Sequence, residues 1–315
     1  MMPKVTVLMS VYNGEKYLRE AMESILNQTF GDFEFLIIND ASTDTSKEII
    51  LSYADLRIVY VENEINLGLT KSLNEGLKLV KGEYVARMDD DDISLPMRLE
   101  KQVQFMDNNP DVGVCGTWFK LFPSGELVER PVTNDEIRLH LFRDNALGHP
   151  TVMLRVEVLK WNNFYYNPEY TYAQDYELWT RLMQKTKMHN IPEVLLKYRV
   201  HETQICKVHT GRQGNLVNVN RLAQLQYLGI VPTEREKDLH LGMVVGSIQI
   251  KADISESSSW IDKLIFANTQ RKIYPEEEFS NMLRKCLEKT RENENVTMGQ
   301  RVEDFLKNII LWKKR

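Results

Sequence analysis

The sequence of 315 residues has few cysteines, no excess of basic residues and no long apolar run. Its three cysteines, Cys115, Cys206 and Cys286, are widely spaced, which excludes a cysteine-ligated metal motif or a disulfide framework and favours a reducing compartment. The formal net charge is -5, so the composition does not indicate nucleic acid as a partner. No stretch of about 18 apolar residues occurs, so no transmembrane helix is expected.

Signals for export and for phosphate binding are also missing. The apolar run of residues 5–12 is too short for a signal peptide, so we expect a soluble, cytoplasmic protein, with contact to a membrane surface left open. Neither G-x-G-x-x-G after the first predicted strand nor G-x-x-x-x-G-K-[ST] anywhere is found. Dinucleotide enzymes and P-loop ATPases are therefore disfavoured, and a metal ion is the expected way to neutralise a bound diphosphate.

The pattern that is present alternates strands with helices over the first two hundred residues. Apolar, β-branched runs predict strands at 5–12, 33–40, 57–63 and 83–89. Helical spacing predicts helices at 14–30, 42–54 and 68–82. This order predicts an α/β fold whose mostly parallel sheet is flanked by helices. From residue 207 onward the patterns are helical, so we expect two domains, 1–206 and 207–315.

Polar residues gather where three predicted strands end. They are Val11 to Asn13, then Asn39 with Asp40, and the acidic run Asp89 to Asp92. In open α/β sheets, ligands bind beyond the carboxyl ends of the strands, so these clusters predict a binding site. The alternative is that they are ordinary polar loops.

The acidic run raises its own question, because four adjacent carboxylates repel one another and are costly to bury. A divalent cation would offset this repulsion, and Mg²⁺ or Mn²⁺ prefers oxygen ligands. Arg87, just upstream, is a candidate partner for one carboxylate. The competing interpretation is a solvated turn in which some of the aspartates cap the following helix.

Four further patterns occur in order along the chain, in residues 5–30, 33–46, 65–103 and 172–182. Together these segments resemble family 2 glycosyltransferases of the GT-A fold, and the resemblance covers roughly residues 3–205. It implies a nucleotide-sugar donor, usually a UDP-sugar, a bound Mn²⁺ or Mg²⁺, and inversion at the anomeric carbon.

The resemblance also implies which residues bind the donor. By match, Val11, Tyr12 and Asn13 after the first strand and Asp40 after the second hold the uracil. A carboxylate can accept a hydrogen bond from uracil N3–H, and a tyrosine can pack on the ring. Lys71 lies where the family often has a donor-contacting residue, although a solvated helix lysine is an equally open interpretation.

The D-x-D motif of the family falls on Asp89, Asp90 and Asp91. Asp91 is expected to ligate the metal, and Asp89 and Asp90 are assigned to the nucleotide sugar. Asp92 is expected to cap or brace the loop. His201, in a further segment that resembles the family, is expected to complete the metal site or contact the diphosphate, with a structural role as the alternative.

An inverting transfer needs a general base, and the family places an aspartate for it in a Glu-Asp pair at a helix start. Here the pair is Gln174 and Asp175, so the aspartate is retained and the preceding residue differs. Asp175 is the predicted base and Glu177 the fallback. The alternative for Asp175 is an acid that complements the helix dipole. His149 is a weaker functional candidate.

The sequence thus predicts a metal-dependent inverting glycosyltransferase with a glycan or lipid-linked oligosaccharide as acceptor. Two alternatives stay open: a sugar-nucleotidyltransferase, and a non-catalytic module that binds nucleotide sugars. The C-terminal segment 302–315 combines bulky apolar residues with three terminal basic ones. It is expected either to contact an anionic membrane surface or to pack on the helical region.

Overall fold

The structure is a computed structural model that describes residues 2–161, 165–202, 210–246, 250 and 253–295. These residues form two compact units, the first ending at Asn220 and the second beginning at Arg221. The segment 302–315, predicted to meet a membrane or the helical region, lies outside the described residues, as does Cys206.

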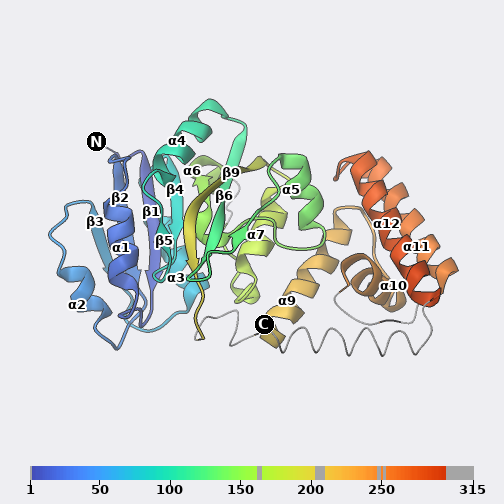
Figure 1. Cartoon of the computed structure of the whole chain (residues 1–315), viewed down its shortest axis with the longest axis horizontal. Coiled ribbons are helices and arrows are strands. Elements are labelled where there is room, and N and C mark those ends of the chain that lie inside the picture. Colours follow the sequence, from blue (N-terminus) through green and yellow to red (C-terminus); the bar gives the residue numbers. More distant parts are fainter. Residues whose placement is uncertain (1, 162–164, 203–209, 247–249, 251–252, 296–315) are drawn as a thin grey trace. The chain divides into compact units, whose positions relative to one another are not determined.

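The first half of the first unit is a parallel arrangement of strands joined by helices, as the sequence predicts (Figure 1). Its elements are β1 (Val5–Val11), α1 (Leu18–Leu26), β2 (Phe33–Asn39), α2 (Ser46–Leu51), β3 (Ile58–Glu62), α3 (Leu69–Leu79) and β4 (Tyr84–Met88). The strands lie in the order β3-β2-β1-β4, and all neighbours are parallel.

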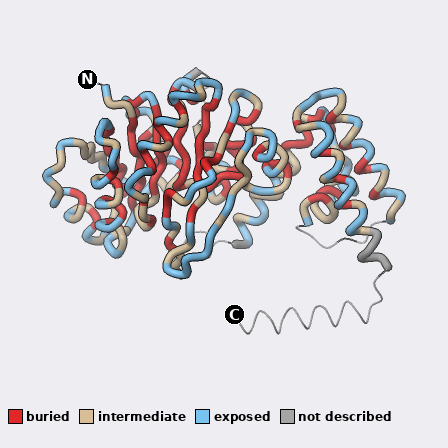
Figure 2. Tube along the Cα trace, turned by 45° about the horizontal axis from the view of Figure 1, so that its top comes forward, coloured by how far each residue is buried: buried red, intermediate tan, exposed pale blue. Residues whose placement is uncertain are grey.

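Helices cover both faces of this half of the sheet. Gly76 of α3 fits against Leu8 on one face. Met22 of α1 joins Val7 and Met9 of β1 in the core on the other face. All residues of β1, β2 and β4 are consequently buried, which explains why these strands are almost continuous apolar runs. Figure 2 shows the buried residues concentrated in these central strands.

The second half of the unit makes the sheet mixed. Its elements are β5 (Ile93–Ser94), α4 (Arg98–Asn108), β6 (Val112–Phe122), β7 (Leu127–Val128), α5 (Asn134–Leu141), β8 (Met153–Arg155), α6 (Val156–Trp161), α7 (Gln174–Leu182) and β9 (Lys187–Arg199). β8 lies antiparallel between β4 and β6, whereas β9 runs parallel to β6. The predicted parallel order therefore describes β1 to β4, and the later strands add antiparallel pairs.

The strand register brings the polar loops to one edge of the sheet. Val11 pairs with Asn39, and Met9 pairs with Met88, so β1, β2 and β4 end close together. β5 follows the acidic run and pairs antiparallel with the end of β9, where Ile93 lies opposite Lys197. The acidic run is therefore held between the end of β4 and the end of β9.

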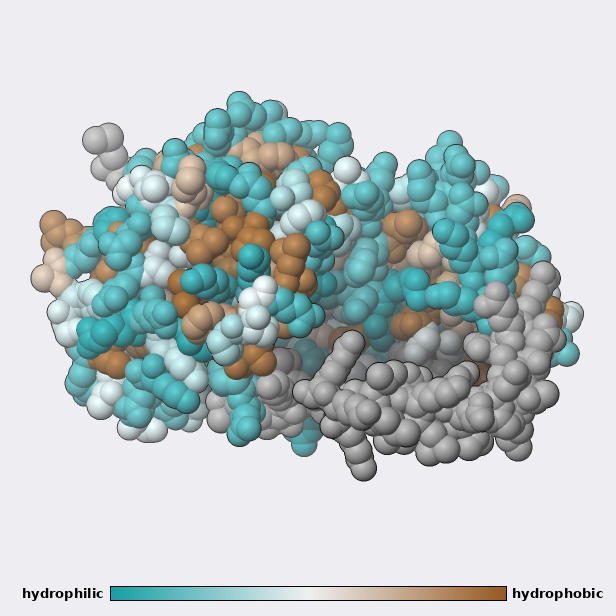
Figure 3. All heavy atoms as spheres, in the orientation of Figure 1, coloured by the Kyte–Doolittle hydropathy of each residue, from teal (hydrophilic) through white to brown (hydrophobic). Residues whose placement is uncertain are grey.

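The second unit is helical over its described residues, as predicted. Its helices are α10 (Glu234–Leu239), α11 (Ile254–Arg271) and α12 (Glu276–Asn295), and α9 (Thr210–Ala223) contains the boundary at Asn220. Buried residues of α11 and α12, such as Trp260 and Phe279, form its core. Within the described part of the chain, no helix has the length and apolar character needed to cross a membrane. Figure 3 shows hydrophilic side chains interspersed with apolar ones on the visible face.

Candidate active site

Two loops at the carboxyl edge, after β1 and after β2, are joined by hydrogen bonds. The backbone N–H of Asn13 donates to Ser42 Oγ (3.0 Å), and Asn13 Oδ1 accepts from the backbone N–H of Thr43 (2.8 Å). The N–H of Gly14 donates to Ser46 Oγ (2.9 Å). Asn13 has φ 54°, a left-handed conformation that asparagine tolerates better than most residues. The predicted donor loop is thus a preformed structure.

Asp40, which follows β2, is 1% exposed and accepts three hydrogen bonds from the protein. Its Oδ1 accepts from Asn63 Nδ2 (2.7 Å) and from the N–H of Leu67 (2.9 Å), and its Oδ2 accepts from the N–H of Gly68 (2.8 Å). These bonds fix the loop that leads into α3. The contact between Asp40 and uracil stays a prediction, and the structure adds a scaffolding role that the sequence did not reveal.

Three other predicted donor residues lie at the rim of this edge. Val11 is the buried last residue of β1, and its carbonyl accepts from the N–H of Asp40 (2.8 Å). Tyr12 follows it with 51% of its surface exposed. Lys71 is exposed in the first turn of α3. The two exposed side chains are accessible to a ligand in this structure.

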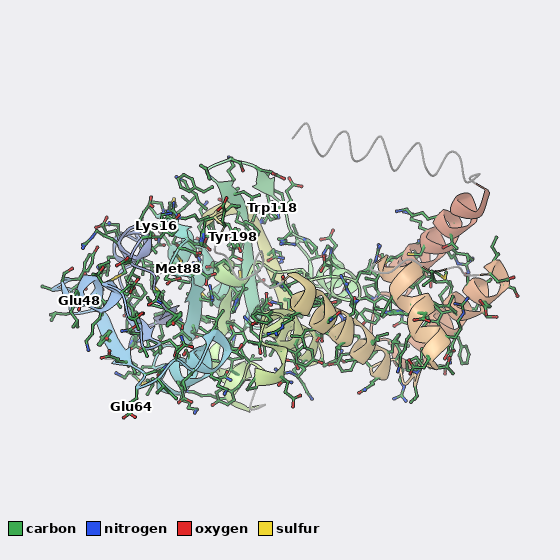
Figure 4. The ribbon with its side chains drawn as sticks, turned by 90° about the horizontal axis from the view of Figure 1, so that it is seen from below. Lys16, Glu48, Glu64, Met88, Trp118 and Tyr198 are labelled. Carbon is green, nitrogen blue, oxygen red and sulfur yellow. The ribbon has the colours of Figure 1, made fainter. Side chains whose placement is uncertain are left out.

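The acidic run begins where β4 ends at Met88, which Figure 4 labels in a view from below. Asp89 forms an ion pair with Arg87, a side chain of β4 that is only 2% exposed. Asp90 turns toward the loop after β1, where a Cβ on Gly14 would overlap Asp90 Oδ2. The glycine therefore permits the close approach of the two loops.

Asp91 and Asp92 are held by the end of β9. His201 Nε2 lies 2.8 Å from Asp91 Oδ2, and Arg199 Nε donates to the Asp91 carbonyl (2.7 Å). The backbone N–H of Arg199 donates to Asp92 Oδ1 (2.8 Å). One carboxylate oxygen from each of Asp89, Asp91 and Asp92 lies within 4.8 Å of the others. The structure therefore brings His201 to the predicted metal ligand Asp91, and it places Asp92 rather than Asp90 in the converging group.

Arg199 is a site residue that sequence reasoning missed. It is 9% exposed, and its guanidinium lies 4.4 Å from the Tyr17 ring centroid and 4.8 Å from that of Phe122. It also pairs with Glu20 of α1. The segment around His201 resembles the family and could have drawn attention to Arg199. Its contact with the acidic run could not be predicted, because it joins residues more than a hundred positions apart.

Electrostatics make this cluster a strong candidate for cation binding. Burial, together with the charges of Asp91 and Asp89, raises the pKa of Asp90 well above its usual range. Burial and the charge of Asp89 likewise raise the pKa of Asp91, against the opposing effect of His201. Burial and its acidic neighbours raise the pKa of Asp92 well above the usual range. Carboxylate oxygens that converge and disfavour one another's ionisation fit a hard divalent cation.

Asp175 comes from a different element than the acidic run, the first turn of α7. It is half-buried, and burial raises the pKa of its carboxyl group. Asn145 Nδ2 donates to Asp175 Oδ2 (2.6 Å), and the N–H of Leu147 donates to Asn145 Oδ1 (3.2 Å). A backbone N–H can only donate, so this second bond fixes which end of the Asn145 amide faces Asp175. Sequence reasoning missed Asn145, since nothing in the chain connects it to α7.

The fallback candidates have partners of their own. Glu177 is 7% exposed and pairs with Arg181 through both oxygens, at 2.7 and 2.8 Å. His149 Nε2 lies 2.9 Å from the Tyr166 hydroxyl, and burial lowers the pKa of His149 well below its usual range. Both are therefore engaged within the protein, whereas among the described residues a side chain donates to Oδ2 of Asp175 but not to Oδ1.

A curled sheet flanked by helices, with polar loops and an acidic run at one edge, defines a protein of the GT-A class. The family model described as Glycosyl transferase family 2 matches residues 6–192, more than half of the chain. The chain belongs to this family of glycosyltransferases, as the sequence indicated.

Relatives and solved structures agree with this assignment. An uncharacterized glycosyltransferase of Haemophilus influenzae is 31% identical over 239 residues, covering 71% of this chain and 74% of that protein. The amylovoran biosynthesis glycosyltransferase AmsE of Erwinia amylovora is 34% identical over 210 residues, covering 64% and 78%. The O-antigen biosynthesis glycosyltransferase WbnJ of Escherichia coli is 34% identical over 209 residues, covering 62% and 80%.

The fold is similar to those of two solved glycosyltransferases. Residues 1–349 of S. aureus TarS, in complex with UDP-GlcNAc, superpose with a TM-score of 0.62 at 21% identity, covering 92% of both chains. The mannosyltransferase PcManGT of Pyrobaculum calidifontis, in complex with GDP-Man and Mn²⁺, gives a TM-score of 0.59 at 18% identity, covering 92% of this chain and 86% of that one. At these identities the likeness establishes the fold alone.

Proposed function

We propose that the protein is an inverting, metal-dependent glycosyltransferase that moves a sugar from a UDP-sugar to a hydroxyl of a glycan or lipid-linked oligosaccharide. One observation carries the proposal: an acidic cluster fit for a cation shares one domain with a separate, oriented carboxylate, Asp175. The leaving diphosphate needs the cation to neutralise its charge, and the attacking hydroxyl needs the carboxylate to take its proton. We assign this chemistry to residues 1–206, with 207–315 as a separate helical region.

The donor binds, in this proposal, at the loops after β1 and β2. Val11, Tyr12 and Asn13 surround the base, and Asp40 accepts from uracil N3–H with lone-pair capacity beyond its three protein bonds. Lys71, exposed in the first turn of α3, is proposed to contribute a positive charge to the donor site. The complex of TarS with UDP-GlcNAc supports a UDP-sugar, while that of PcManGT with GDP-Man keeps a guanine donor as the alternative.

The cation is Mn²⁺ or Mg²⁺, with Asp91 as a ligand and His201 beside it. Asp89 and Asp90 are assigned to the nucleotide sugar, and Asp89 also supports the cation through its place among the converging oxygens. A bound divalent ion would supply positive charge for the diphosphate as it leaves. The oxygen-rich donor set supports this choice, as does the Mn²⁺ in the PcManGT complex.

Asp175 acts as the general base. It takes the proton from the acceptor hydroxyl as that oxygen attacks the anomeric carbon and the bond to the nucleoside diphosphate breaks. Attack opposite the leaving group inverts the configuration. Burial makes the Asp175 carboxylate more basic, and the bond from Asn145 to Oδ2 orients it, with Oδ1 as the oxygen proposed to take the proton.

Polysaccharide assembly is the setting we propose, because the relatives include proteins described for amylovoran and O-antigen biosynthesis. Such acceptors are carried on lipids, so we place the protein in the cytoplasm or peripherally at the inner face of the cell membrane. Segment 302–315 is the proposed point of membrane contact.

A panel of UDP-sugars, tested for Mn²⁺-dependent hydrolysis and for transfer to polysaccharide precursors, tests the function. We expect one UDP-sugar to be consumed with Mn²⁺ and not with EDTA, and not by the Asp175→Asn variant when an acceptor is present. Pyrophosphorolysis of a UDP-sugar would indicate a nucleotidyltransferase instead. Tight donor binding without any turnover would indicate a binding module.

A further inference from the structure

Asp92 differs from the other members of the acidic cluster in how its charge is compensated. Asp89 has the Arg87 guanidinium, and Asp91 has the His201 ring. Asp92 is 0% exposed, and its Oδ1 accepts the backbone N–H of Arg199. Among the residues that the structure describes, Asp92 Oδ2 has no hydrogen-bond partner.

A buried carboxylate oxygen without a partner is costly, so its position calls for an explanation. One carboxylate oxygen is enough to brace the loop, and Oδ1 already does so by accepting the hydrogen bond from the Arg199 N–H. The same bond fixes the side-chain rotation, so Oδ2 is held in place. A carboxylate oxygen of Asp92 also lies within 4.8 Å of one from Asp89 and one from Asp91.

We propose that Asp92 Oδ2 is a ligand of the divalent cation, alongside the oxygens of Asp89 and Asp91. The inference rests on the proposed function, because that function supplies the cation. It changes the role given to Asp92 from bracing alone to bracing with Oδ1 and binding with Oδ2. Asp90, whose Oδ2 abuts Gly14 of the neighbouring loop, is not a ligand.

Mn²⁺ alone serves as the probe, so the test needs neither the sugar nor the acceptor. The full chain is freed of metal with a chelator and titrated with Mn²⁺, with free Mn²⁺ followed by its paramagnetic resonance signal. Asp92→Asn keeps an oxygen to accept the Arg199 N–H and replaces the other oxygen with an amide nitrogen. Asp90→Asn is the matched control, with the same change of charge one residue from Asp91.

We expect Asp92→Asn to weaken Mn²⁺ binding at least about 10–100-fold, because losing even a residue that only supports a ligand usually costs that much. Asp90→Asn should weaken it much less. Because Asp92→Asn removes a buried carboxyl group that Asp89 and Asp91 repel, the metal-free variant should also unfold at a higher temperature than the metal-free wild type. A residue that only braces the loop would not produce this pair of opposite effects.

Equal Mn²⁺ affinities of Asp92→Asn and Asp90→Asn, with tight binding by the wild type, would overturn the inference and leave the proposed function intact. Absence of Mn²⁺ binding by the wild type would overturn the metal dependence itself, and the inference with it. If Asp92→Asn does not fold, Asp92→Ser replaces it, since its hydroxyl can accept the same Arg199 N–H.

Discussion

Asp40 and the acidic run, which lie at the same edge of the sheet, differ in how their negative charge is compensated. Asp40 is buried, and its two oxygens accept three hydrogen bonds from the loop before α3. In the run from Asp89 to Asp92, Asp92 is buried and the others are partly buried, yet the carboxylates of Asp89, Asp91 and Asp92 converge on one another. A buried carboxylate whose oxygens accept hydrogen bonds from amide groups stabilises the fold. Carboxylates that converge without enough positive charge around them are suited to bind a cation.

The largest effect should come from Asp91→Ala, which tests the ligand-dependent side of this comparison. We expect transfer to fall below detection and UDP binding in Mn²⁺ to weaken, because the diphosphate loses its counterion. The fold should persist, since the variant removes a charge from a repulsive cluster. Calorimetry of UDP binding checks this, and equal affinities of the wild-type protein in Mn²⁺ and in EDTA would refute the metal assignment.

Asp175→Asn should come next, with a loss of transfer on the order of 10²–10⁴-fold, the usual contribution of a general base. The amide keeps the size of the side chain and can still accept from Asn145 through its oxygen, so donor affinity should change little. Initial rates and UDP titrations measure the two quantities separately. A rate near that of the wild type would move the base elsewhere, and Glu177→Gln would then be the variant to assay.

Asp40→Ala tests the scaffold side. It leaves the N–H groups of Leu67 and Gly68 without their acceptor, so the free energy of unfolding should fall on the order of 3 kcal/mol. If Asp40 also binds uracil, UDP affinity should fall by roughly 1.5–3 kcal/mol at temperatures where the variant stays folded.

Asn63→Ala is the matched control for this variant, because it removes one of the scaffold bonds and keeps the carboxylate. Urea unfolding and UDP calorimetry on both variants separate the two roles. Wild-type stability in Asp40→Ala would contradict the scaffolding role, and unchanged UDP affinity would remove Asp40 from the base site.

The sequence predicted local features of the site better than their connections. Residue order placed β1 to β4 and the acidic run, because strand and helix periods are local properties. Arg199 and Asn145 were missed because their contacts, to Asp91 and to Asp175, depend on how β9 and the loop after α5 fold back. The unpartnered oxygen of Asp92 was equally invisible, since burial and hydrogen bonding are properties of the folded chain.

The smallest predicted effect concerns the orientation and basicity of Asp175. Because burial raises its pKa, we expect activity to be lost, as pH falls, at a higher pH than for an ordinary aspartate. The amide of Asn145 donates to the charged form and so opposes this rise.

Asn145→Ala should therefore raise the pKa further and move the acidic limb of the pH–rate profile to higher pH, with a modest change in rate well above that limb. The profile of kcat/KM for transfer measures this shift, because it reports groups of the free enzyme. Asn145→Asp offers a sharper version, since a second carboxylate at the same position should move the limb further in the same direction. A merely structural role would lower the rate equally at all pH values, and an unchanged limb in both variants would show that Asn145 does not tune the base.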